Sequence, residues 1–157
     1  AKQTIIRKFT PSERLTARAV VAEGNVVLAR FDTATKLDEL LRAFSDRHVS
    51  FKDLSLGVHG GSMVIPLLNV PDWAAARRQL RAAFPSLELD EGVAVVSVVG
   101  DGLAATPEPL RRFLRSLGGE GIATYSLVGG PLRLSAVIDG ARAGEAQRAL
   151  HAAFIAG

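Results

Sequence analysis

Two loops that lead into predicted helices carry the polar residues best suited to chemistry in this 157-residue chain. The first reads "FDTATKLDEL" (31–40) and the second reads "GDGLAATPEPL" (100–110). The first turn of a helix has backbone N–H groups without intrahelical partners and a partial positive charge, which favour a carboxylate ligand. Both loops also have a structural interpretation. Thr35 is an N-cap residue with Asp38 in the next turn, and Thr106 is an N-cap followed by Pro107 at the first helical position.

Outside these two loops the sequence has no motif for catalysis or metal binding. The three histidines are His48, His59 and His151, and no two of them have the spacing of metal ligands. The sequence has no cysteine, no Ser/His/Asp arrangement and no P-loop, and after Gly100 and Gly102 no third glycine follows at G-x-G-x-x-G spacing. "HGG" (59–61) is typical of a turn between two strands. We therefore expect no catalytic residue, no metal and no cofactor in this segment.

Composition and charge narrow the class of protein. Hydrophobic residues make up 48% of the chain, which is enough for a core, and no apolar run is long enough to cross a membrane. The net charge is +3, and the arginines are spread over helical stretches beside Asp and Glu. This spread favours solvated helix faces over a nucleic-acid surface. The sequence shows no export signal, so we expect a cytoplasmic protein. It does not begin with Met, so either the Met was removed or the chain is a segment of a longer one.

These loops belong to a pattern that occurs twice, with a period of about 70 residues. "KLDELLRAF" (36–44) and "EPLRRFLRSL" (108–117) carry apolar residues at the same helical spacing, i, i+3, i+4 and i+7. "AARRQLRAAF" (75–84) and "EAQRALHAAF" (145–154) are a second matching pair of helices. We expect the stripes of these helices to be nearly fully buried, at Leu40, Leu41, Leu80, Leu114, Leu117 and Leu150.

Strand-like segments surround each pair of helices. They are "VSFKDLSLGV" (49–58), "SMVIPLL" (62–68), "IATYSLVG" (122–129) and "LRLSAVI" (132–138), with further pairs of strands around Glu-Gly in 19–31 and 87–99. The order predicts an α+β fold of two ferredoxin-like βαββαβ units. The first unit ends with a strand at 86–90, whereas the second ends near Phe154 without one, and a surplus strand lies at 16–22. Either the first unit is inserted in the second, or 16–22 forms a local hairpin with 26–31.

Three stretches resemble a known family. "LELDEGVAVVSVVGDGLAATPEPLRRFLRSL" (87–117) resembles the start of the second ACT domain of aspartokinases, with Gly100, Gly102, Leu103 and Pro107 at the family's positions. "VIDGARAGEAQRALHAAF" (137–154) resembles the end of that domain, and "TIIRKF" (4–9) resembles the strand that follows the kinase domain. The resemblance implies two tandem ACT units, the first (24–92) inserted in the second (10–23 plus 93–157). Residues 1–9 would be a linker from an N-terminal kinase domain that this segment lacks.

The sequence departs from the family pattern in three places. Glu108 stands where the family has glycine, "SLVGGP" (126–131) replaces the usual "STSE", and the first loop contains no glycine. The resemblance still implies effector sites where the first strand of each unit enters its helix. In the first unit the site would consist of Asp32, Thr33, Thr35, Lys36, Ser50, Phe51, Lys52 and Asp53. A possible second effector site would consist of Asp101, Gly102, Thr106, Tyr125 and Ser126.

The resemblance also implies a function and a partner. The chain would sense an amino acid, lysine or threonine, and would control aspartate phosphorylation by feedback in lysine, threonine and methionine biosynthesis. Two chains would pair along residues 49–56, so that 32–36 of one chain lies near 50–53 of the other. One alternative is a free-standing ACT dimer without ligand. Another is an RNA-binding module of the same topology, but its central strands would need exposed aromatic residues and these strands have none. We expect neither a nucleic-acid partner nor a membrane partner.

Overall fold

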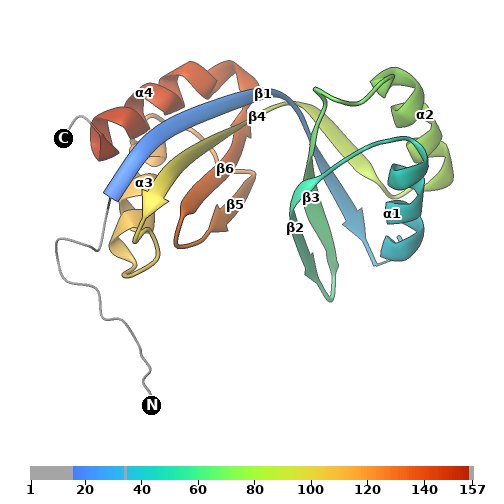
Figure 1. Ribbon diagram of the computed structural model, residues 1–157, viewed down its shortest axis with the longest axis horizontal. Coiled ribbons are helices and arrows are strands. Elements are labelled where there is room, and N and C mark those ends of the chain that lie inside the picture. Colours follow the sequence, from blue (N-terminus) through green and yellow to red (C-terminus); the bar gives the residue numbers. More distant parts are fainter. Residues whose placement is uncertain (1–15, 34, 156–157) are drawn as a thin grey trace, which may run out of the picture. The chain divides into compact units, whose positions relative to one another are not determined.

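The computed structural model describes residues 16–33 and 35–155. The predicted linker 1–9 and residues 10–15 of the predicted second unit lie outside the described residues. Hydrogen bonds connect the six strands in the order β2-β3-β1-β4-β6-β5 (Figure 1). The fold class is α+β, as the sequence predicts, but the strands form one continuous series and not two separate sheets.

The described chain divides into two compact units. The first unit, residues 23–94, contains the second part of β1 (Thr16–Asp32) and the first part of β4 (Glu88–Asp101). Between them lie α1 (Leu37–Asp46), β2 (Lys52–Gly57), β3 (Gly60–Pro66) and α2 (Trp73–Ala83). The second unit contains residues 16–22 of β1 and residues 95–101 of β4. Its other elements are α3 (Glu108–Gly119), β5 (Ser126–Gly129), β6 (Arg133–Asp139), the short 3-10 helix η1 (Gly140–Arg142) and α4 (Ala143–Phe154).

Each unit buries its helices against one face of its strands (Figure 1). In the first unit Leu40 and Leu80, from the two helices, are fully buried with alternate residues of β1 and β3. In the second unit Leu117 and Leu150 take the same positions against β4 and β6. The repeated apolar helix stripes of the sequence therefore form two separate cores.

Two of the six leucines predicted to be buried are not. Leu41 is only partly buried, and Leu114 keeps 39% of its surface exposed. The sheet covers the residues on the inner line of α3, Phe113 and Leu117, while Leu114 lies on the flank of the apolar stripe. The stripe in the sequence is therefore wider than the face that the strands cover.

The predicted pairs of strands around Glu-Gly are each one uninterrupted strand. β1 continues through Glu23, Gly24 and Asn25 without reversing, although Asn25 has φ 52°. Its second part pairs antiparallel with β3, from Val26 with Pro66 to Asp32 with Gly60. The local hairpin of 16–22 with 26–31 is therefore wrong, because the two segments hydrogen-bond to other strands.

The turn predicted at "HGG" is confirmed between β2 and β3. Gly60 has φ 126°, and a Cβ on it would lie 2.2 Å from the carbonyl oxygen of Phe31. A Cβ on Gly61 would lie 2.3 Å from the carbonyl oxygen of Ser55. Both glycines are therefore required by close backbone approach. Across 16–33 and 35–155, no helix is long and apolar enough to span a membrane.

Candidate functional site

The two halves of the predicted first-unit site lie at opposite ends of the strands. Asp32, at the end of β1, is level with Gly60 of β3 and, through it, with Gly57 at the end of β2. Lys52 begins β2 and pairs instead with Val64. Along β3 these two levels, Gly60 and Val64, are four residues apart, which corresponds to roughly 13 Å. The structure therefore does not bring 32–36 and 50–53 of one chain together.

The connection between β1 and α1 is a closed turn. The backbone N–H of Thr35 donates to the carbonyl of Asp32 at 3.1 Å. The N-cap of α1 is Lys36, and no side chain caps the helix. The Thr35 hydroxyl lies 2.9 Å from the hydroxyl of Ser86 instead. The interpretation of Thr35 as the N-cap is therefore wrong.

Contacts also hold the other half of this site, at the start of β2. The Lys52 ammonium bonds the Glu23 carboxylate at 2.5 Å. The ring of Phe51 lies edge-on to that of Phe44 in α1, with centroids 6.4 Å apart. Asp53 has φ 55° and lies where the β2–β3 register shifts. Ser50 is exposed. This segment consequently has an irregular backbone, which directs Asp53 differently from a residue in a regular strand.

A cavity of about 340 Å³ opens at the N-terminus of α1. It lies between this helix and the connection from α2 to β4. Only two of the predicted site residues, Thr35 and Lys36, contribute to its wall. The full lining is Thr35, Lys36, Glu39, Ala83, Phe84, Pro85 and Ser86.

The predicted second-unit site is divided in the same way. Asp101 is the last residue of β4 and Gly102 follows it, at the end of the strand where the N–H of Gly100 donates to the carbonyl of Leu132 at 3.0 Å. Tyr125 and Ser126 lie near the other end of β6, since Ser126 pairs with Val137. Asp101 bonds Arg18 of β1 at 2.5 Å and Gly102 has φ 71°. These residues therefore do not form one site within a single chain.

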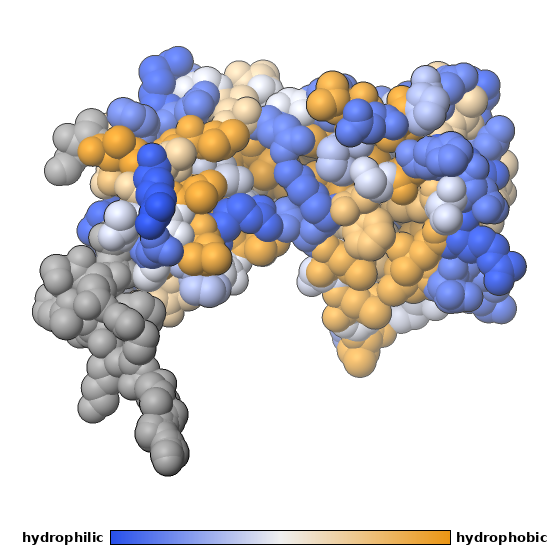
Figure 2. All heavy atoms as spheres, viewed as in Figure 1, coloured by the Kyte–Doolittle hydropathy of each residue, from blue (hydrophilic) through white to orange (hydrophobic). Residues whose placement is uncertain are grey.

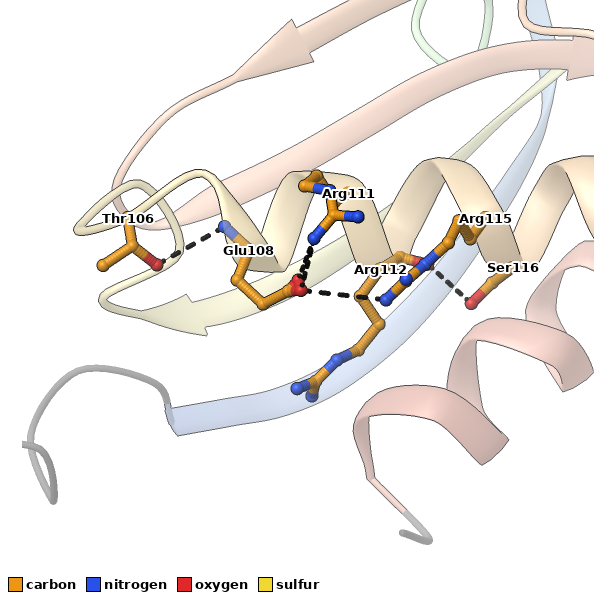
Figure 3. A network of polar contacts seen from close by, with 6 residues as sticks. All are labelled: Thr106, Glu108, Arg111, Arg112, Arg115 and Ser116. Atoms are coloured by element: carbon orange, nitrogen blue, oxygen red, sulfur yellow. Dashed lines mark hydrogen bonds and ion pairs between the residues drawn. The ribbon is translucent and has the colours of Figure 1, made fainter.

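Thr106 lies at the start of α3, in a network around Glu108 (Figure 3). The Glu108 backbone N–H donates to the Thr106 hydroxyl at 3.4 Å. The N-cap of α3 is Pro107 and not Thr106, so the helix begins one residue later than the sequence predicts. The Glu108 carboxylate bonds Arg111 at 3.0 Å and Arg115 at 3.7 Å. The hydroxyl and the carboxylate are thus occupied by the helix itself.

A second cavity, of about 310 Å³, lies beside this helix start. Thr106 is the only residue of the predicted second site in its wall. The remaining lining is Leu103, Ala104, Ala105, Pro107, Leu110, Gly129, Gly130 and Leu134. With its single hydroxyl side chain, the wall suits an apolar group and offers no charged partner.

Comparison with known proteins shows which structures have a similar fold. No protein-family model and no curated protein sequence matches the chain. Among solved structures, the ligand-free regulatory subunit of aspartate kinase from Thermus thermophilus is similar with a TM-score of 0.73 and 21% identity. The match covers 90% of this chain and 98% of that one. The chain has the fold of an aspartate kinase regulatory subunit. The regulatory subunit from Thermus flavus is also similar, with a TM-score of 0.72 at 20% identity over 88% of this chain and 98% of that one.

Complete aspartate kinases contain the same fold as one part of a longer chain. Aspartokinase III of E. coli, in complex with lysine and aspartate in its T-state, is similar with a TM-score of 0.70 and 16% identity. The match covers 88% of this chain and 33% of the E. coli chain. The chain thus spans about a third of that enzyme's length.

Sequence analysis did not identify most of the residues that line the two cavities of this regulatory-subunit fold. Ser86 and Pro85 follow α2, far in sequence from the loop they contact, and nothing local indicated that contact. Gly129 and Gly130 lie in "SLVGGP", the segment that departs from the family pattern. That departure was the available signal for the second cavity.

Within residues 16–33 and 35–155, no group of three His, Cys, Asp or Glu side chains is placed so that it could hold a metal ion. The hydrogen bond from Arg77 holds the pKa of Glu91 below its ordinary value, against the opposing effect of partial burial. This pair connects α2 to β4 and lies outside both predicted sites.

Proposed function

We propose that this chain is the regulatory region of an aspartate kinase, and that an amino-acid effector bound to it controls aspartate phosphorylation. The observation that carries the proposal is the extent of the structural match, which includes nearly all of the Thermus thermophilus regulatory subunit. Catalysis would belong to a kinase domain outside this segment. We propose lysine or threonine as the effector, with feedback in lysine, threonine and methionine biosynthesis. A lysine complex of one similar enzyme supports this choice.

The proposal includes two ACT units, the first at 24–92 and the second at 10–23 plus 93–157. It also includes a homodimer formed through the first units. β2 is an edge strand at one end of the strand order, so its outer edge has no neighbouring strand among the described residues. Apolar residues on and beside β2 are exposed, namely Leu54, Leu56 and Val58, and Figure 2 shows orange surface where β2 and β3 lie in Figure 1. An exposed apolar edge of this kind supports pairing with a second copy.

The strand register explains why a dimer would complete the effector site. In an antiparallel pair of β2 strands, the Lys52 end of one chain lies beside the Gly57 end of its partner. Gly57 is level with Asp32 through Gly60. The pairing would therefore bring 32–36 of one chain towards 50–53 of the other, which the single chain keeps apart. Carboxylates from both chains could then bind the ammonium groups of an amino acid.

Regulation would follow from a difference in affinity. An effector held by two chains binds the paired arrangement and has no complete site on the single chain, so it shifts the population towards the pair. A kinase domain attached to each chain would respond to that shift. By reciprocity, any change in the kinase part that favours the paired arrangement would raise the affinity for the effector.

The test is a thermal-shift and sedimentation series with lysine, threonine and methionine. We expect one of these amino acids to raise the unfolding temperature and the dimer fraction. The Asp32→Asn, Asp53→Asn double variant should lose both responses. Asparagine is used at Asp53 because it tolerates the left-handed backbone there better than alanine.

The matched control is Asp46→Asn with Glu88→Gln, which removes two exposed negative charges outside the proposed site. A response to an amino acid that survives the Asp32/Asp53 substitutions would contradict this placement of the site. A dimer that responds to none of the amino acids would contradict the sensing function and would indicate an assembly module without ligand.

A further inference from the structure

A single contact between two hydroxyl groups joins two turns that are far apart in the sequence of the first unit. The Thr35 and Ser86 oxygens lie 2.9 Å apart, and the contact is partly buried. Thr35 closes the turn after β1, since its N–H donates to the carbonyl of Asp32 at 3.1 Å. Ser86 lies inside the turn after α2, which the N–H of Leu87 closes on the carbonyl of Phe84 at 3.0 Å. The hydroxyl pair therefore connects two turns that are each fixed by their own backbone bond.

In the second unit a threonine also stands two residues before the first residue of a helix, as Thr35 does before α1. There the Thr106 hydroxyl accepts the backbone N–H of Glu108 at the start of α3 (Figure 3). When Phe84 is matched with Phe154, the sequence has Ala156 at the position of Ser86, which carries no hydroxyl. In the first unit, α1 has no side-chain cap although Thr35 precedes it. The Thr35 hydroxyl thus bonds Ser86 at the expense of a possible contact with its own helix.

The bond of the Thr35 hydroxyl to Ser86 affects the stability of the start of α1. A threonine hydroxyl at a helix start can satisfy one of the unpaired N–H groups there. In the first unit that stabilisation is absent, and the hydroxyl instead fixes where the turn lies relative to the α2–β4 connection. The same two residues, with Lys36 and Pro85, form part of the wall of the 340 Å³ cavity. The contact therefore also sets the width of that cavity at the N-terminus of α1.

We propose that Ser86 is a positioning residue for the proposed effector site: through Thr35 it holds the β1–α1 turn in the geometry in which that turn binds an effector. This role rests on the proposed function, and no residue of the α2–β4 connection belongs to the predicted site. Ser86 acts through Thr35 and needs no contact with the effector. Loss of its hydroxyl would leave the Thr35 side chain able to turn towards the backbone of α1.

The first experiment measures amide hydrogen exchange of Thr35 and Leu87 by NMR, as protection factors. Ser86→Ala and Thr35→Val should each lower the protection of Thr35 about 2- to 10-fold, the effect of one lost hydrogen bond. The double variant should lose no more than either single one, because both remove the same contact. Ser86→Thr keeps a hydroxyl and should restore protection. The amide of Val70, which bonds Leu67 in another turn of the unit, serves as the internal reference.

Two results of this experiment would overturn the proposal. One is an unchanged protection factor of Thr35 in Ser86→Ala. The other is a double variant in which the two single effects multiply, since that would mean that the hydroxyls act independently. Ser45→Ala, which removes an exposed hydroxyl from α1 of the same unit, should leave the protection of Thr35 as it is.

The second experiment separates this role from the proposed function itself. The affinity for lysine and threonine is measured by calorimetry in the wild type, Ser86→Ala, Ser86→Thr and Ser45→Ala. We expect Ser86→Ala alone to weaken binding, by about 2- to 10-fold. Equal affinities in the wild type and Ser86→Ala would overturn the positioning role while leaving the regulatory function intact. A wild type that binds neither amino acid would contradict the proposed function, and the exchange data would then still decide whether Ser86 fixes the turn.

Discussion

The carbonyl oxygen of Thr16 lies against the backbone of Gly100, only 2.1 Å from where a Cβ on that glycine would be. Thr16 begins β1 and Gly100 lies near the end of β4. Gly100 is the first glycine of a G-x-G sequence, a pattern that suggests approach of a ligand to the backbone. In this structure another strand occupies that space, so the glycine is required by the packing of β1 beside β4.

Gly100→Ala should therefore destabilise the second unit. The added methyl would meet the Thr16 carbonyl and lie 2.8 Å from the Ala17 Cα, and both atoms are backbone. We expect a loss of about 1–3 kcal/mol in the free energy of unfolding, the usual cost of overpacking, measured by urea denaturation. Gly118→Ala is the control, because no atom lies within 4 Å of a Cβ there and the residue is in α3. It should be neutral or stabilising by up to about 1 kcal/mol. Equal effects of the two substitutions would contradict the close contact between the strands.

The two leucines on α3 should differ in their contribution to stability. Leu117 is 1% exposed within the second core, whereas Leu114 is 39% exposed on the flank of the helix. Leu117→Ala should cost about 2–5 kcal/mol, the range for a buried leucine. Leu114→Ala should cost less than about 1 kcal/mol, since much of its surface already contacts solvent. Thermal unfolding of both variants checks the order, and a larger loss from Leu114→Ala would show that the helix is rotated relative to this structure.

The helices of both units could be predicted because their signal is local. The spacing of Leu37, Leu40 and Phe44 is repeated in α3, and a stripe of this kind needs only a nearby apolar surface to be buried. The same signal could not set the limit of the buried face. That limit depends on how closely the strands approach the helix, and for this reason Leu114 was misassigned.

Features that depend on distant contacts could not be predicted from the sequence. "AEGN" (22–25) reads as a turn, yet β1 continues through it because its two parts pair with different strands. The separation of Asp32 from Asp53 follows from the β2–β3–β1 register, which no sequence periodicity specifies. The contact of Thr35 with Ser86 likewise joins residues 51 positions apart.

Acidification should weaken the first unit through Glu91. The Arg77 guanidinium lies 2.7 Å from its carboxylate and holds the pKa of Glu91 below the ordinary value of 4.5. A carboxyl whose pKa is lower in the folded state stabilises the fold above its unfolded pKa. That stabilisation is lost as the pH falls through the folded pKa. The effect should appear below about pH 4.5 and should not exceed about 1 kcal/mol, since both side chains are 35% exposed.

The measurement for Glu91 is the free energy of unfolding between pH 3 and pH 7, in the wild type and in Glu91→Gln. The substitution should flatten part of the acid limb of the curve and lower stability at neutral pH. Glu88→Gln is the control, because Glu88 is more exposed and its bond to Arg30 is 3.9 Å long. An acid limb unchanged by Glu91→Gln would show that the Arg77 bond does not contribute in solution.

A charge on the outer edge of the first unit should prevent the proposed dimer without unfolding the chain. Leu56 lies on β2 and is 59% exposed, so Leu56→Lys adds a charge where solvent already reaches the side chain. In the dimer that ammonium would be buried beside a second apolar edge, at a large cost in desolvation. We expect the dissociation constant, from sedimentation equilibrium, to rise at least about tenfold, a difference of 1.4 kcal/mol or more. Leu68→Lys makes the same chemical change at an 82% exposed leucine that follows β3, and it should leave the association as it is. Association weakened equally by both variants would point to a general effect of charge, and association weakened only by Leu68→Lys would place the dimer contact on another surface.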